Sequence, residues 1–103
     1  MKITNRDAIT WIATRQDFQT GNRTLWGAWL PNYYLPIYSR LPGEDADALR
    51  ATFENAGPRG VYVVFSYATP IGWFDGETWY VSPTKYSVTT SRHQGILRQG
   101  VAG

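Results

Sequence analysis

The sequence predicts an α+β fold in a single small domain, residues 1–103, with an antiparallel β-meander of about five or six strands. Short helices are expected near both termini, and an acidic helix at about residues 44–56 is expected as an insertion between strands. The length supports one domain, because 103 residues have room for one hydrophobic core. The composition supports a sheet, because Trp, Tyr and Phe make up 16% of the chain and favour half-buried pleated surfaces.

The first predicted element is a helix from about residue 5 to residue 14. Thr4 is placed to cap it, and Asp7 lies in the first turn, where the helix dipole favours a negative charge. Ile3 can pack on Ala8 as a hydrophobic staple. These signals together predict where the helix begins.

A β-hairpin is predicted over residues 18–26, because Gly21 at the first position of a two-residue loop suits a type II′ turn. This turn would pair Phe18 with Leu25. The second strand ends before a proline. The Tyr-rich stretch 32–42 that follows is expected to form an edge strand or an ordered loop, because another proline interrupts it.

The clearest helical pattern lies at about residues 44–56. Acidic residues fill its first turn, and Leu49 and Phe53 recur on one face. Gly57 is expected to supply the left-handed position at the C-terminal end, and Pro58 prevents continuation. The acids are interpreted as partners of the helix dipole.

From Val61 the apolar pattern changes to a period of two, which predicts the central strand. The dipeptide Asp75-Gly76 then predicts a type I′ turn that pairs Phe74 with Glu77. Residues 85–88 are expected to add another strand. Together these elements predict consecutive antiparallel strands.

A short terminal helix is predicted from the capping-box spacing of Ser91 and Gln94, and Gly95 weakens it. The segment before this helix concentrates hydroxyl, guanidinium, imidazole and amide groups, and free backbone N–H groups at a helix start favour an anion. No acidic side chain follows Glu77. The candidate binding residues are Lys85, Tyr86, Thr90, Ser91, Arg92, His93, Gln94 and Arg98.

A structural interpretation of the same segment stays open. Thr90 or Ser91 with Gln94 would then only cap the helix, Arg92 would be solvated or paired with a carboxylate, and His93 would bond a backbone carbonyl. Exposed aromatics beside an arginine would favour base stacking or a protein contact. The aromatics expected on exposed faces or loops are Tyr33, Tyr34, Tyr38, Tyr62 and Tyr80.

Composition also predicts what the protein lacks. With no Cys and with His93 as the single histidine, structural zinc is excluded, and no other metal or cofactor is expected. No phosphate loop and no nucleophile elbow is present, so an enzyme is the less favoured interpretation. The absence of Cys and of a long apolar run favours a location inside a cell, with no membrane partner.

Two segments, Ser66–Trp73 and Tyr86–Gln94, resemble the shared block of a family of short uncharacterised proteins encoded by phages of actinobacteria. The similarity covers about residues 61–96, with a weaker match at 18–25. That family has no assigned activity, so the resemblance implies a phage origin and the host cytoplasm but no catalytic residue. The stretch from about 31 to 60 departs from the pattern and is interpreted as an insertion.

In size and layout the chain is also similar to small microbial ribonucleases, which are basic α+β proteins that use a Glu base, an Arg on the phosphate and a late His acid. That resemblance implies these roles for Glu77 or Glu54, for Arg92 and for His93. Because neighbouring residues point in different directions in most backbones, the pairing of Arg92 with His93 weakens this hypothesis.

The leading hypothesis is a small non-enzymatic phage protein that binds a macromolecule in the host cytoplasm. Nucleic acid is favoured slightly over a host protein because the C-terminal segment is basic and free of acids. The alternatives are a metal-independent ribonuclease that uses His93 and Arg92, and a self-associating structural or host-protein interaction module. The oligomeric state stays open, with a homodimer among the alternatives.

Overall fold

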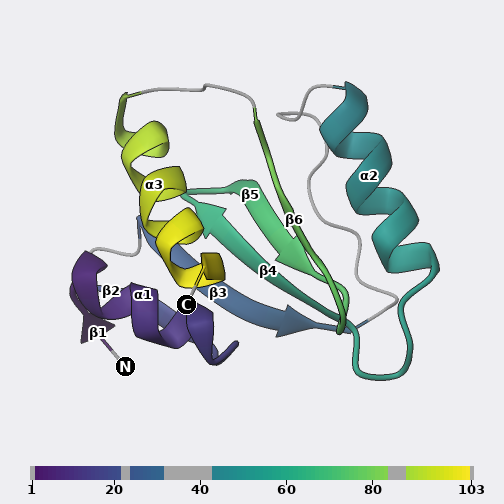
Figure 1. Ribbon diagram of the computed structural model, residues 1–103, viewed down its shortest axis with the longest axis horizontal. Coiled ribbons are helices and arrows are strands. Elements are labelled where there is room, and N and C mark those ends of the chain that lie inside the picture. Colours follow the sequence, from purple (N-terminus) through teal and green to yellow (C-terminus); the bar gives the residue numbers. More distant parts are fainter. Residues whose placement is uncertain (1, 22–23, 32–42, 84–87, 103) are drawn as a thin grey trace.

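The computed structural model of the chain describes residues 2–21, 24–31, 43–83 and 88–102 (Figure 1). These residues form one sheet whose strands follow the order of the chain, β1-β2-β3-β4-β5-β6. The elements are β1 (Lys2–Ile3), α1 (Asn5–Ala13), β2 (Phe18–Thr20), β3 (Leu25–Leu30), α2 (Gly43–Glu54), β4 (Val61–Ser66), β5 (Thr69–Phe74), β6 (Trp79–Val81) and α3 (Val88–Ala102). The α+β prediction is therefore confirmed.

The strands from β2 to β6 form the predicted antiparallel meander. The strand β1 was not predicted; it pairs in parallel with β2 at the edge of the sheet. Two expected elements, the stretch 32–42 and most of the strand at 85–88, lie outside the described residues, and Val88 belongs to α3.

Different helices cover the two faces of the sheet, as Figure 1 shows. Tyr62 and Val64 of β4 face a core that includes Ile12 of α1 and Leu97 of α3. The alternate residues of β4 face a second core beneath α2. Its buried side chains are Leu49, Phe53, Val61, Val63, Phe65 and Trp73. Because both faces are covered, every residue of β4 is buried, and the predicted alternation separates two cores.

The start of α1 is as predicted. The Thr4 hydroxyl accepts a hydrogen bond from the Asp7 N–H at 3.2 Å, and the Asp7 carboxylate accepts one from the Thr4 N–H at 3.4 Å. These reciprocal bonds form a capping box.

In the described chain, no helix is long and apolar enough to cross a bilayer.

The register of the first hairpin differs from the prediction. Phe18 pairs with Gly27 and not with Leu25. The Leu25 N–H donates to the Thr20 side-chain oxygen at 3.3 Å, so the loop closes through a side chain and is longer than a two-residue turn. The partner of Phe18 moves by two positions, which leaves every side chain on its predicted face.

The pairing at the turn between β5 and β6 also differs from the prediction. Phe74 pairs with Trp79 and not with Glu77. The Asp75 carboxylate accepts hydrogen bonds from the backbone N–H groups of Glu77 and Thr78, both at 2.8 Å. These bonds stabilise a wider turn than the predicted type I′ turn, and they lower the pKa of Asp75.

Two predictions about helix ends are wrong. Gly57 does not adopt a positive φ; the left-handed residue in this connection is Gly60, with φ 85°, and a Cβ there would collide with the Leu30 carbonyl oxygen. Ser91 and Gln94 lie inside α3, which begins at Val88, so they do not form a capping box. The terminal helix is also longer than predicted, at 15 residues.

Candidate functional site

The predicted binding residues differ in their exposure to solvent. Lys85 and Tyr86 lie outside the described residues. The others belong to α3, where Ser91, Arg92 and Arg98 are exposed and Thr90, His93 and Gln94 are buried. The hydroxyl-rich segment therefore presents only part of its polar groups to solvent.

His93 fastens α3 to the end of β4. Its Nδ1 atom lies 2.7 Å from the Ser66 Oγ atom, and Ser66 Oγ lies 3.1 Å from the Thr90 hydroxyl. Only 1% of His93 is exposed. The partner of His93 is thus a side-chain hydroxyl and not the backbone carbonyl of the structural interpretation. Burial, with a contribution from Arg92, lowers the pKa of His93, which favours the neutral imidazole.

A second buried polar cluster surrounds Asp45. Its carboxylate accepts hydrogen bonds from the Tyr80 hydroxyl at 2.7 Å and from the Ser82 hydroxyl at 2.5 Å. The Gln94 amide donates to the Ser82 carbonyl at 3.2 Å, which ties α3 to the same cluster. Asp45 lies in the first turn of α2, as predicted, but the prediction did not include its burial: only 1% of the residue is exposed.

The sequence held a signal for this burial that the analysis missed. Asp45 precedes Leu49 by four residues, and Leu49 precedes Phe53 by four, so all three lie on the same face of α2. That face packs on the sheet. An acid on the apolar face of a helix needs hydrogen-bond donors, which β6 and the residue after it supply.

Tyr67 occupies the turn between β4 and β5 in an uncommon conformation. Its φ is 55°, in the left-handed region that Gly and Asn adopt more readily than a bulky residue. Its N–H donates to the Thr24 carbonyl at 2.8 Å, and the Trp26 indole donates to the Tyr67 carbonyl at 2.8 Å. Trp26 is itself stacked on Phe65, with ring centroids 3.9 Å apart. The turn is therefore fixed on both sides.

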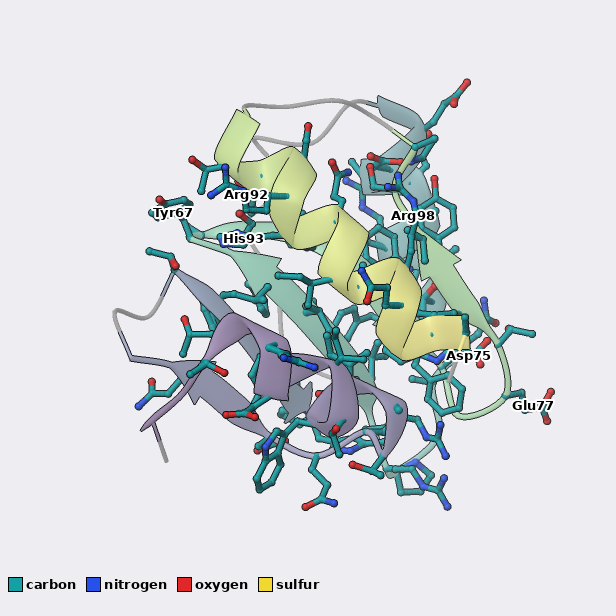
Figure 2. All side chains as sticks on the ribbon, turned by 60° about the vertical axis from the view of Figure 1, so that its left-hand side comes forward. Tyr67, Asp75, Glu77, Arg92, His93 and Arg98 are labelled. Atoms are coloured by element: carbon teal, nitrogen blue, oxygen red, sulfur yellow. The ribbon has the colours of Figure 1, made fainter. Side chains whose placement is uncertain are left out.

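The fixed turn presents the ring of Tyr67 to solvent. Half of the residue (50%) is exposed, which makes it the most exposed large hydrophobic residue in the described part of the chain. Its ring centroid lies 6.1 Å from that of His93, so the ring stands over the start of α3. Figure 2 shows Tyr67, His93 and Arg92 together at this end of the helix. We call the exposed side chains of Tyr67 and Arg92 the Tyr67–Arg92 surface.

Two other aromatics that the sequence analysis expected on exposed faces are not free. Tyr62 is buried, and its hydroxyl donates to the Gln16 carbonyl at 2.7 Å. Burial raises the pKa of Tyr62 above its usual value. Tyr80 is half-buried and stacks on Trp73 with centroids 4.7 Å apart. Tyr33, Tyr34 and Tyr38 lie outside the described residues.

Charge is distributed unevenly between the two faces of the sheet. On one face, α3 contains Arg92 and Arg98 and no acidic residue. On the other, α2 contains four acids and Arg50, which pairs with Asp47 at 3.3 Å. Figure 2 shows Arg92 and Arg98 on different sides of α3, so the structure does not bring these two predicted site residues together.

The ribonuclease constellation is not assembled. Figure 2 shows Glu77 beside Asp75, at the opposite end of the molecule from His93. Glu54 lies on α2, on the other face of the sheet. His93 is covered and bonded to Ser66, which leaves it no direct access to a substrate.

The remaining features of the described residues do not add to the Tyr67–Arg92 surface. A cavity of about 410 Å³ lies between α2 and the turn after β5, and its lining includes Thr52, Asn55, Asp75 and Glu77. No group of three or more His, Asp or Glu residues is placed to hold a metal ion in the part of the chain that the structure describes.

Comparison with known proteins identifies a family to which the chain is similar. The model of a protein family of unknown function matches residues 43–100. This range includes the segment 61–96 that the sequence analysis singled out, and it also includes α2, so the acidic helix is part of the matched region. No curated protein and no solved structure matches the chain.

Proposed function

The chain belongs to this family of unknown function, DUF8033, and from the geometry of its own residues we propose that it is a non-enzymatic protein that binds nucleic acid. The resemblance of Ser66–Trp73 and Tyr86–Gln94 to actinobacteriophage proteins supports the further proposal of a phage protein acting in the host cytoplasm. The Tyr67–Arg92 surface is the proposed contact. Tyr67 would stack on a base, and Arg92 would pair with a phosphate.

The conformation of Tyr67 is the observation that supports this proposal most directly. A bulky residue in the left-handed region is strained by about 1–2 kcal/mol, and half of Tyr67 remains exposed, so it buries less apolar area than an aromatic in the core. Packing alone therefore does not explain an aromatic at this position. Backbone strain of this kind concentrates at functional sites, where it presents a side chain in a fixed orientation.

The distribution of charge supports the same partner. Arg92 makes no ion pair with a described residue, so its guanidinium is available to a phosphate. The absence of acids from α3 leaves this face attractive to a polyanion, whereas α2 would repel it. A nucleic acid would therefore approach the molecule from the side of α1 and α3.

A mobility-shift titration at several salt concentrations tests the proposal. The expected result is binding at low salt that weakens as salt rises, because each phosphate contact releases counterions. The variant Arg92→Ala should weaken binding and reduce the salt slope by about one. Arg50→Ala removes the same charge from the opposite face and should leave binding unchanged.

Three outcomes would contradict the proposal. They are no shift at low salt, a shift that does not depend on salt, and equal weakening by Arg92→Ala and Arg50→Ala. Cleavage of the probe would instead support the ribonuclease hypothesis. That hypothesis predicts that His93→Ala abolishes the cleavage.

A further inference from the structure

We infer that the Tyr67–Arg92 surface binds single-stranded nucleic acid in preference to a duplex. This inference rests on the proposed function and names the class of strand that the surface takes. It follows from the geometry of one fixed aromatic ring beside one guanidinium.

The exposed ring of Tyr67 can contribute only by stacking on a base with a free face. In a duplex each base is already stacked on both sides, so an interior base would have to leave the helix first. An unpaired strand offers such faces at every nucleotide, and stacking on an aromatic side chain tolerates any base. The ring therefore favours the single strand.

The turn that holds Tyr67 strengthens this preference. The bonds from Tyr67 to Thr24 and from Trp26 to Tyr67 fix the backbone before a ligand arrives. The ring contact with His93 limits the movement of the side chain. Because few degrees of freedom remain to be lost, most of the stacking energy is available for binding.

The arginines of α3 do not form a paired basic site. Arg92 and Arg98 are six residues apart, which corresponds to about 240° of rotation around a helix with 3.6 residues per turn. Figure 2 shows them on different sides of α3. The two guanidinium groups therefore do not form a continuous basic stripe on one side of α3. A single arginine beside a stacking ring matches instead one base and its neighbouring phosphate in an unpaired strand.

Fluorescence anisotropy with a labelled thymidine oligonucleotide tests the inference. A length of about 20 nucleotides exceeds the number of nucleotides that a small domain covers. The same strand is measured alone and paired with its complement. We expect the wild-type protein to bind the unpaired strand about tenfold more tightly than the duplex. Doubling the length of the duplex separates binding along the helix from stacking on its ends, because the number of ends stays constant.

Two variants of Tyr67 separate stacking from folding. Tyr67→Phe keeps the ring and should keep the preference for the single strand. Tyr67→Asn removes the ring and places a residue that tolerates the left-handed region, so its melting temperature should be unchanged or higher. Its affinity for the single strand should fall about tenfold, to the level of the duplex.

The outcomes distinguish the inference from the proposed function. Equal, salt-dependent binding of both probes that Tyr67→Asn does not change would overturn the inference and leave nucleic-acid binding in place. Binding of the duplex alone would do the same. If the protein binds neither probe, both the inference and the proposed function are overturned.

Discussion

Ser66 and His93, 27 positions apart in the sequence, meet through a hydrogen bond of 2.7 Å that joins the end of β4 to α3, and both residues are buried. The contact lies next to the Tyr67–Arg92 surface, because Tyr67 follows Ser66, Arg92 precedes His93, and the rings of Tyr67 and His93 are 6.1 Å apart. The stability of this junction therefore determines whether the two exposed side chains keep their relative positions.

Removal of the Ser66 hydroxyl should destabilise the protein. Ser66→Ala leaves His93 Nδ1 without its partner and also removes a bond to Thr90. An unsatisfied buried polar group costs about 1–3 kcal/mol, so we expect a loss of this size in the free energy of unfolding, measured by urea denaturation. Ser91→Ala, at an exposed position of α3, is the control and should change it by less than about 0.5 kcal/mol. Equal effects of the two variants would show that the junction adds no stability.

Stability should fall as the pH falls below neutrality, because His93 must remain neutral in the folded protein. Burial, with Arg92, lowers its folded pKa from the usual 6.5. Between the lowered value and 6.5 the unfolded chain binds a proton that the folded chain does not, so stability rises with pH in this window. The contribution is complete above about pH 6.5 and is lost as the pH falls through the folded pKa.

Urea denaturation at several pH values measures this slope, and His93→Gln should reduce it. The carboxyl of Asp75, the other described group with a lowered pKa, starts from 3.8, so its contribution is lost only in a more acidic window. An identical slope in the wild type and His93→Gln between about pH 5 and pH 7 would mean that another group controls it.

The carboxylate of Asp45 should be essential for the docking of α2. Asp45→Ala leaves the hydroxyls of Tyr80 and Ser82 without their acceptor, and we expect a loss of about 2–4 kcal/mol in the free energy of unfolding. Asp47→Ala removes an exposed acid from the same helix and should cost less than about 1 kcal/mol, because its surface ion pair with Arg50 is weak.

A double-mutant cycle makes the Asp45 prediction specific. Tyr80→Phe should destabilise the wild-type protein more than it destabilises Asp45→Ala, because the bond to the carboxylate is already absent in the latter. Additive effects would show that the Tyr80 hydroxyl and Asp45 do not interact in solution.

Local patterns predicted most elements of the fold, with β1 and the start of α3 as exceptions. The alternation in β4 and the capping residues Thr4 and Asp7 act within a few positions of the chain, so they could be recognised without a structure. Strand register could not be predicted, because the side chains of Thr20 and Asp75 close the loops through hydrogen bonds that the turn dipeptides do not specify.

The candidate site was less predictable, because exposure depends on which helix covers which face of the sheet. His93 was singled out as a binding residue, yet α3 turns it inward to Ser66. Tyr67 was not among the candidate residues, because only the structure shows that β4 ends before it and that the turn directs its ring to solvent. Only the order of strands and helices in space decides these outcomes.

The glycines of α3 provide a test of how closely this helix packs. A Cβ at Gly95 would meet nothing within 4 Å, so Gly95→Ala should stabilise the protein by about 1 kcal/mol through helix propensity alone. A Cβ at Gly100 would lie 2.6 Å from a methyl carbon of Ile12 and 3.2 Å from the Ile9 carbonyl oxygen. Gly100→Ala should therefore force α3 away from α1 and destabilise the protein by about 1–3 kcal/mol. Thermal unfolding of the two variants should thus shift in opposite directions, and a rise in both melting temperatures would contradict the close contact of α1 with α3.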